Sequence, residues 1–228
     1  MLQLVYTADG SKTIFNPEIG ETYHSRHGAL QEGMHVFLNA GLRHFLTTAN
    51  TKSEPSILEV GLGTGLNFLL SANFCLEYNL KVDYVGIETS PLEAALICEM
   101  GYEQYVSVRL WNWFIKNYSS SINDRVELDG CCTLKTAHCE LLDFQSEKRF
   151  DIIYFDAFSA IHQPEMWSDQ SLEHVCQFLK TGGVFVTYAI TGNLKRSLKS
   201  LGFVIEKIPG APGKREMLRA TKIREASF

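Results

Sequence analysis

The sequence predicts an α/β fold, a doubly wound and mostly parallel β-sheet with an antiparallel strand at one edge. From residue 57 onward, short apolar runs alternate with stretches of helical periodicity, which is typical of a parallel sheet covered by helices on both faces. The last two strand-like runs flank the turn-forming segment 209–213 (PGAPG), which predicts an antiparallel hairpin. The 228 residues, 45% of them hydrophobic, suffice for one large domain with a buried core.

The first 50 residues are predicted to form an extension of the main domain, which we place at residues 51–228. Residues 2–15 alternate between apolar and polar side chains around Asp9-Gly10, a dipeptide typical of hairpin turns. Between Met34 and Leu46 the apolar residues recur at helical spacing, which predicts an amphipathic helix.

The remaining elements are predicted in order along the chain. We expect strands at residues 57–60, 82–87, 134–139, 150–155, 184–188, 203–208 and 215–220. We expect helices over residues 66–76, from Pro91 onward, around residues 111–115, over 168–180 and over 194–201. Pro91 suits a first helical position, Ser168 suits an N-cap, and the glycine pair at 182–183 suits a helix end.

The sequence disfavours several classes of protein. No apolar stretch reaches the roughly 18 residues of a membrane-spanning helix, and the N-terminus lacks the basic start and apolar core of a signal peptide. The six cysteines form no C-x-x-C pair, so we expect free thiols, no metal and a cytoplasmic protein. The alternative is a metal cluster of Cys131, Cys132, His138 and Cys139, which the difficulty of aiming adjacent cysteines at one ion disfavours.

A glycine-rich turn follows the strand at 57–60 and opens the next helix. Its spacing is G-x-G-x-G, whereas dinucleotide enzymes use G-x-G-x-x-G. Glu59 would repel a pyrophosphate and suits the cationic groups of S-adenosylmethionine, while Glu88, at the end of the next strand, can accept hydrogen bonds from both hydroxyls of a ribose. The candidate residues for binding this donor are Glu59, Gly61, Leu62, Gly63, Thr64, Gly65, Asn67, Glu88 and Asp156.

Asp156 follows the strand at 150–155 and should project into the same cleft. Methyl transfer is an in-line displacement, so positioning supplies much of the acceleration. For an amine acceptor, a carboxylate here can accept an N–H hydrogen bond, orient the lone pair and stabilise the developing positive charge. We therefore predict that Asp156 is the catalytic residue; the alternative is a residue that caps a turn.

The C-terminal stretch has the opposite charge balance from the rest of the chain. Residues 180–228 carry 10 Lys and Arg against 3 Asp and Glu, whereas residues 1–179 carry 11 against 23. Such asymmetry predicts a local anionic partner, and the alternative is a solvated basic edge. An RNA would be held by basic side chains and by aromatic side chains that stack on unpaired bases, although Trp167 also suits a place in the core. The candidate substrate-binding residues are Phe158, Trp167, Lys195, Arg196, Lys214 and Arg215.

Seven stretches along the chain resemble the methyltransferase family that makes 5-methylaminomethyl-2-thiouridine at the wobble position of tRNA. They are DGSKT (9–13), YHSRHGALQE (23–32), HVFLNAGL (35–42), EVGLGTGLNF (59–68), FDAFSAIHQPEMW (155–167), TYAITGNLKRSLKSLGF (187–203) and PGAPGKREMLRA (209–220). The D-A-F-S…P-E-M-W and K-R-E-M blocks are the distinctive parts.

The resemblance implies a class I, Rossmann-like methyltransferase fold with S-adenosylmethionine as donor. The acceptor would be the 5-aminomethyl group of 2-thiouridine in a tRNA anticodon loop. By the motif match, the residues that contact the donor would be Gly61, Gly63, Gly65, Asn67, Glu88 and Asp156. Some relatives add a flavin-dependent oxidase domain, for which a chain ending at Phe228 has no room, so we expect no FAD.

Two departures from the family pattern concern the site. Gln163 stands where relatives usually have Asn. Relatives often place Asp after the third strand to hold the adenine amine, whereas residues 137–140 here read AHCE, so Glu140 or a backbone carbonyl is the candidate. The alternative functions are a methyltransferase acting on another nucleic acid or a small molecule, a nicotinamide-dependent oxidoreductase, and a non-catalytic RNA-binding protein.

Overall fold

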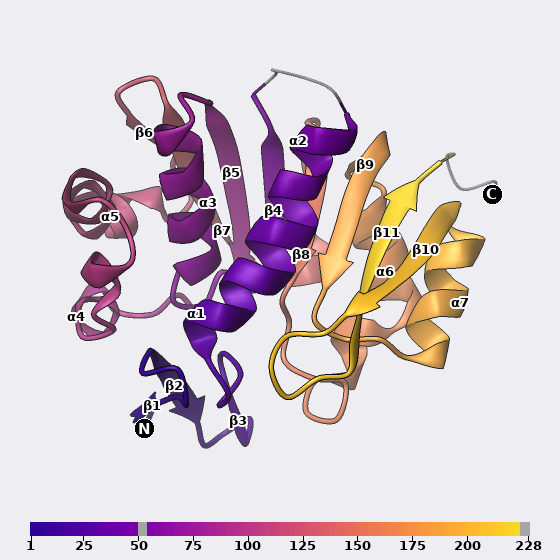
Figure 1. The fold of residues 1–228 in the computed structure, drawn as a ribbon, viewed down its shortest axis with the longest axis horizontal. Helices are drawn as coiled ribbons and strands as arrows, with labels where there is room; N and C mark the ends of the chain where they lie inside the picture. Colours follow the sequence, from indigo (N-terminus) through magenta and orange to yellow (C-terminus); the bar gives the residue numbers. More distant parts are fainter. Residues whose placement is uncertain (50–53, 224–228) are drawn as a thin grey trace.

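The computed structural model describes residues 1–49 and 54–223, with an eight-stranded sheet at its centre (Figure 1). The strand order is β10-β11-β9-β8-β4-β5-β7-β6. Neighbours from β9 to β7 pair in parallel, whereas β11 runs antiparallel to β9 and β10, and β6 runs antiparallel to β7. The strands are β4 Ser56–Val60, β5 Val82–Glu88, β6 Val126–Leu128, β7 Cys132–His138, β8 Phe150–Phe155, β9 Leu179–Thr187, β10 Phe203–Pro209 and β11 Glu216–Lys222. The predicted doubly wound fold and its antiparallel edge hairpin are confirmed.

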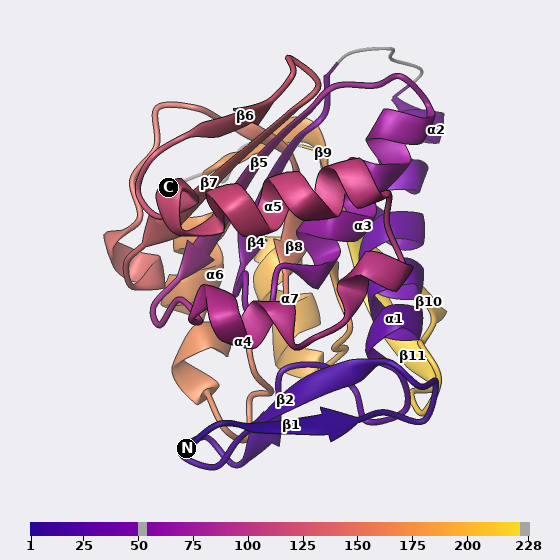
Figure 2. The ribbon, with the colours of Figure 1, turned by 90° about the vertical axis from the view of Figure 1, so that its left-hand side faces the viewer.

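Helices cover both faces of the sheet (Figures 1 and 2). One face carries α3 (Leu66–Glu77), α5 (Val108–Ser121) and a long helix from the N-terminal region, and the other carries α6 (Asp169–Cys176) and α7 (Gly192–Ser200). Each face has its own cluster of buried apolar side chains. Successive residues of β8 alternate between the two clusters, as the pleat of a strand requires.

The long helix consists of α1 (Ala29–Glu32), a π-helical stretch η1 (Gly33–Arg43) and α2 (His44–Thr48). It confirms the predicted amphipathic helix and begins five residues earlier than Met34. Gly41 allows it to lie directly against the sheet, because a Cβ there would stand 2.7 Å from the ring of Tyr154 on β8. The helix therefore packs on the sheet itself, while our division of the chain near residue 50 stays a prediction.

A small three-stranded sheet lies below the carboxyl ends of the central strands (Figures 1 and 2). It is formed by β1 (Gln3–Tyr6), β2 (Lys12–Asn16) and β3 (Glu21–Thr22), and it confirms the predicted hairpin. Asp9 fastens the hairpin turn to the long helix: its Oδ1 accepts the backbone N–H of Ser11 at 2.9 Å and its Oδ2 that of Gln31 at 3.0 Å. The small sheet is thereby held over the strand ends.

Two predicted helix boundaries were wrong. The helix that begins after its N-cap Ser168 ends at Cys176, and the 182–183 glycine pair lies inside β9. The pairing of β9 with β8 is irregular there, and a Cβ on Gly183 would stand 2.9 Å from the backbone oxygen of Asp151, so glycine serves a close approach of two strands. Helix α4 (Ala94–Cys98) begins after Glu93, which is still extended, rather than at Pro91. The short edge strand β6 was not predicted.

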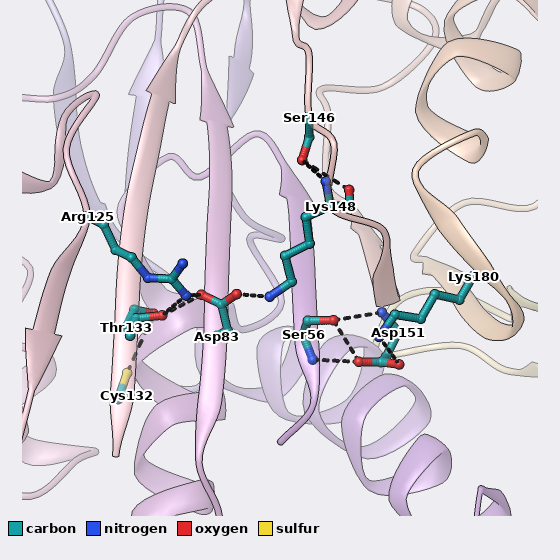
Figure 3. Close-up of polar contacts among 9 residues, drawn as sticks. All are labelled: Ser56, Asp83, Arg125, Cys132, Thr133, Ser146, Lys148, Asp151 and Lys180. Atoms are coloured by element: carbon teal, nitrogen blue, oxygen red, sulfur yellow. Dashed lines mark hydrogen bonds and ion pairs between the residues drawn. The ribbon is translucent and has the colours of Figure 1, made fainter. Parts of the chain in front are cut away.

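A cluster of charged side chains joins the amino ends of the central strands, at the opposite edge from the small sheet (Figure 3). Asp83 on β5 pairs with Arg125 and Lys148. Asp151 on β8 accepts hydrogen bonds from the backbone N–H and the hydroxyl of Ser56 on β4, at 2.9 and 2.6 Å, and pairs with Lys180 at 2.8 Å. These contacts tie neighbouring strands together.

In the described part of the chain, no helix has the length and apolarity to cross a membrane.

Candidate functional site

Three glycines make the connection from β4 to α3 possible. Gly61, Gly63 and Gly65 have φ angles of 84°, 52° and 76°, a left-handed backbone that other residues adopt only with strain. Gly61 also needs to lack a side chain, because a Cβ there would lie 2.7 Å from the backbone oxygen of Asp156. The turn thus brings its backbone against the end of β8.

Glu88 stands at the end of β5, beside this turn. Its Oε2 accepts the backbone N–H of Gly63 at 2.9 Å, and its Oε1 accepts that of Ser90 at 3.0 Å. The two backbone groups fix the orientation of the carboxylate, and each of its oxygens keeps a second lone pair for a ligand.

A cavity of about 160 Å³ opens at these strand ends. The ends of β4, β5 and β8 form one side of it, and the small N-terminal sheet forms the other. Its polar wall includes Glu88, Glu140 and Asp156, and its aromatic wall includes Tyr23 and Phe158, whose rings meet edge to face at 5.2 Å. The cavity therefore combines apolar and aromatic surfaces with a few oriented polar groups, as small-molecule sites do.

The structure divides the predicted donor-binding residues into two groups. The residues that line the cavity are Gly61, Leu62, Gly63, Glu88 and Asp156. Glu59, Thr64, Gly65 and Asn67 are not among its lining residues. Thr64, which is fully buried, lies 3.0 Å from the hydroxyl of Tyr102, and Gly65 packs against the ring of Phe114. These four residues therefore pack behind the residues that line the cavity and do not face it.

Asp156 and Glu59 are linked through Asn67 on α3. The Asn67 Nδ2 donates hydrogen bonds to Asp156 Oδ2 and to Glu59 Oε1, both at 2.8 Å. Glu59 has no exposed surface, and its Oε2 accepts the hydroxyl of Tyr84 at 2.8 Å. Burial raises the pKa of Glu59 well above its ordinary value, and Asp156 raises it further. Burial also raises the pKa of Asp156 well above its ordinary value, and the negative charge of Glu32 raises it further.

A second cavity of about 200 Å³ adjoins the first. The residues that line both cavities are Tyr23, His24, Asp156, Ala157 and Phe158. The second cavity also has the carboxyl groups of Glu21 and Glu32 and the cationic groups of Arg26 and Lys214. Burial lowers the pKa of His24 to about 4, so its ring is neutral at pH 7. The second cavity is therefore polar, with acidic groups on three elements.

Lys214 connects the β10–β11 loop to the long helix across the second cavity. Its ammonium group pairs with Glu32 at 2.9 Å and lies 3.6 Å from the centre of the Tyr188 ring. Glu32 is 5% exposed and its second oxygen accepts the backbone N–H of Ser25 at 2.7 Å. An ammonium group is thus accommodated here by a buried carboxylate and an aromatic face.

The other predicted substrate residues lie outside both cavities. Trp167 donates its ring N–H to the backbone oxygen of Phe158 at 2.8 Å and packs edge to face on Phe155 at 5.0 Å, so its visible role is to support Phe158. Arg215 is exposed, as is Arg196, which donates to Asn193. Lys195 is half-buried on α7. Of the predicted set, only Phe158 and Lys214 line a cavity.

Sequence reasoning missed the N-terminal wall of the site. Tyr23, His24, Glu21 and Glu32 reach the cavities because the small sheet and the start of the long helix lie over the strand ends. Residues 23–32 belong to a stretch that resembles the methyltransferase family, and this was the available signal. The three cysteines of the alternative metal cluster are free thiols, and no grouping of His, Cys, Asp or Glu suited to a metal ion occurs within residues 1–49 and 54–223.

The comparison with protein families gives one match over more than half of the chain. A family described as S-adenosyl-L-methionine-dependent methyltransferase matches residues 105–223. The matched part contains Asp156 and the edge hairpin, whereas the glycine turn and Glu88 precede it.

Curated relatives share the larger part of the chain. The tRNA 5-methylaminomethyl-2-thiouridine biosynthesis bifunctional protein MnmC of Leptospira interrogans is 30% identical over 219 residues, which cover 90% of this chain and 33% of that protein. The protein of the same name from Acidovorax sp. is 26% identical over 224 residues, covering 92% and 34%. The chain thus spans about a third of the length of these relatives.

Two solved structures share the fold. The crystal structure of MNMC2 from Aquifex aeolicus superposes with a TM-score of 0.81 at 24% identity, covering all of this chain and 73% of that one. Magnesium protoporphyrin IX methyltransferase from Synechocystis, solved with bound S-adenosylmethionine, superposes with a TM-score of 0.52 at 12% identity, covering 85% and 81%.

Proposed function

The chain belongs to the S-adenosyl-L-methionine-dependent methyltransferase family, and we propose that it transfers the methyl group to the 5-aminomethyl nitrogen of 2-thiouridine at the wobble position of tRNA. The observation that carries this proposal is the position of Asp156, which lines both cavities. A donor in the first cavity and an acceptor amine in the second would meet at this residue.

The residues of the first cavity fit the donor. Gly61 and Gly63 line this cavity, and their lack of side chains lets the turn pack against the Asp156 backbone and the Tyr23 ring. Glu88, held by two backbone N–H groups, is suited to accept both ribose hydroxyls. Glu140 lines the same cavity and is our candidate for the adenine amine.

Asp156 is suited to act on the acceptor. S-adenosylmethionine supplies an electrophilic methyl group on a positively charged sulfur. Asp156 Oδ2 already accepts a hydrogen bond from Asn67, so we expect Oδ1 to accept an N–H of the amine. Because its pKa is raised, this carboxylate is a stronger base than an ordinary aspartate and is better matched to taking a proton from the amine near neutral pH.

The second cavity suits an acceptor that combines a base with an amine. Phe158 offers an aromatic ring on which a base can stack, and the carboxyl group of Glu21 favours a positively charged amine. The exposed Arg215, in the loop that carries Lys214, is our candidate for a contact to the RNA backbone. The names of the curated relatives support a tRNA substrate, and with it a cytoplasmic site of action.

Nucleoside mass spectrometry tests the proposal. The protein is incubated with methyl-labelled S-adenosylmethionine and tRNA that carries 5-aminomethyl-2-thiouridine, and the control is the same tRNA with unmodified uridine at the wobble position. We expect label in 5-methylaminomethyl-2-thiouridine of the first tRNA and none in the control. Label in another nucleoside would show that the methyl acceptor is not the proposed one. If calorimetry showed binding of NADH and none of S-adenosylmethionine, the protein would be an oxidoreductase rather than a methyltransferase.

A further inference from the structure

A buried and a half-buried carboxyl group, those of Glu59 and Asp156, share a single amide nitrogen at the donor cavity. Glu59 Oε1 and Asp156 Oδ2 each lie 2.8 Å from Asn67 Nδ2, so both hydrogens of this nitrogen are used on carboxyl oxygens. Asn67 is 3% exposed, and its Oδ1, which faces Gly33, has no hydrogen-bond partner in the described part of the chain. A flipped amide would turn that oxygen toward two acceptors, so the carboxyl groups fix its orientation.

Lys214 favours ionisation of Asp156, but its ammonium group is paired with Glu32 rather than with either member of this pair. Within residues 1–49 and 54–223, neither Glu59 nor Asp156 forms an ion pair. Two carboxylates this close in a buried site repel each other, and one of them is expected to keep its proton. We therefore expect only one of these two carboxyl groups to be ionised at a time.

The two members of the pair have different surroundings. Glu59 has no exposed surface, and within the described residues its carboxyl group accepts hydrogen bonds from neutral groups, the Asn67 amide and the Tyr84 hydroxyl. A hydroxyl accepts as well as donates, so a proton on Glu59 Oε2 has an acceptor in Tyr84. Asp156 lines both cavities. The negative charge is therefore more stable on Asp156.

We propose that Glu59 and Asn67 are positioning residues of the methyl-transfer site: Glu59 stays protonated so that Asp156 carries the charge, and Asn67 fixes which Asp156 oxygen faces the acceptor. Glu59 thereby acts through Asn67 rather than by contact with the donor. This inference rests on the proposed role of Asp156 in the reaction.

Other groups also influence the charge on Asp156, and none of them replaces the Asn67 contact. Acidic groups that disfavour ionisation come from β3, the long helix and β4, and one ammonium group from the β10–β11 loop favours it. The titratable or charged side chains that face Asp156 or share its cavities are Glu21, Tyr23, His24, Arg26, Glu32, Glu59, Glu88, Glu140, Tyr188 and Lys214.

Infrared spectroscopy of the protein alone tests the protonation directly. A buried, protonated carboxyl group gives a carbonyl band that an ionised one lacks. We expect this band in the unsubstituted protein at pH 8, its loss in Glu59→Gln and its persistence in Asp156→Asn. A band that persists in Glu59→Gln and disappears in Asp156→Asn, or no band at all, would overturn the proposal. This result does not depend on which acceptor the enzyme uses.

The role of Asn67 is tested by the pH dependence of methyl transfer. Loss of its N–H in Asn67→Leu removes a hydrogen bond to a charged group, so we expect kcat to fall about tenfold or more, the acidic limb of the profile to move to higher pH, and donor affinity to stay. Asn73→Leu is the matched control, since Asn73 donates to the exposed Glu77 from the same helix. If Asn67→Leu folds and its acidic limb lies at the same pH as that of the unsubstituted protein, Asn67 has no positioning role. If the unsubstituted protein itself transfers no methyl group to the tRNA, the proposed function is wrong.

Discussion

At the scale of single residues, the proposed methyl transfer depends on the carboxyl group of Asp156. We predict that Asp156→Ala lowers kcat/KM for methyl transfer by about 100-fold or more, the usual contribution of a positioned acid–base group. Donor affinity, measured by calorimetry, should change much less, because the glycine turn and Glu88 remain. Activity near that of the unsubstituted protein would remove Asp156 from the mechanism.

The raised pKa of Asp156 predicts an acidic limb in the pH profile. Burial, followed by the charge of Glu32, raises this pKa, so the ionised form is lost as the pH falls through a value above the ordinary aspartate range of about 3.9. Methyl transfer should therefore decline on acidification well before an ordinary aspartate titrates. A steady-state profile of kcat/KM that stays flat down to about pH 4 would contradict this.

Glu88 is predicted to contribute to donor affinity rather than to chemistry. Glu88→Ala should weaken donor binding by about 10- to 100-fold, since hydrogen bonds to a charged group are lost. Glu93→Ala is the control, because Glu93 is exposed and its side chain caps no helix. Equal donor affinity of the two variants in calorimetry would exclude Glu88 from the donor site.

At the scale of elements, two glycines with the same φ angle allow the cost of backbone strain to be distinguished from the cost of a steric clash between neighbouring elements. Gly61 and Gly182 both have φ 84°, but a Cβ on Gly61 would meet Asp156 at 2.7 Å whereas one on Gly182 would meet nothing within 4 Å. Gly182→Ala should cost about 1–2 kcal/mol of stability and keep donor binding. Gly61→Ala should cost more and lose donor binding, as measured by denaturation and calorimetry; equal effects would argue against the close approach of turn and strand.

The sequence predicted the elements that have a strong local pattern. The apolar run at 150–155 became β8 with the expected bounds, and Ser168 caps α6 as expected. The glycine pair at 182–183 was misread because a glycine required by close strands looks the same in sequence as one that ends a helix. Strand β6 has only three residues, and its pairing with β7 is decided by tertiary contacts.

Only those site residues that stand at the carboxyl ends of strands were predictable from the sequence. Glu88 and Asp156 were placed correctly at the cavity because the carboxyl ends of parallel strands meet at one edge. Glu32 and Tyr23 were missed, since a loop and a helix from the N-terminus reach the same edge through long-range packing. The burial of Glu59 behind Asn67 also depends on packing that no local pattern shows.

At the scale of the whole molecule, the two edges of the sheet have separate tasks. Asp83, at the edge opposite the cavities, pairs with both Arg125 and Lys148 (Figure 3). We predict that Asp83→Asn lowers the free energy of unfolding by about 1–2 kcal/mol and leaves methyl transfer intact. Asp129→Asn, which breaks an exposed pair with Arg109, should cost less than about 0.5 kcal/mol; a larger cost for Asp129 would contradict the stabilising role of the cluster.

We propose that the methyl donor binds between the glycine turn, Glu88 and Asp156, in the cavity beside the small N-terminal sheet. A crystal structure of the protein with S-adenosylhomocysteine tests this most directly. We expect the ribose hydroxyls on the carboxylate of Glu88 and the sulfur on the side of the cavity where Asp156 lies. A ligand bound elsewhere, or bound with both carboxyl groups turned away from it, would contradict the account.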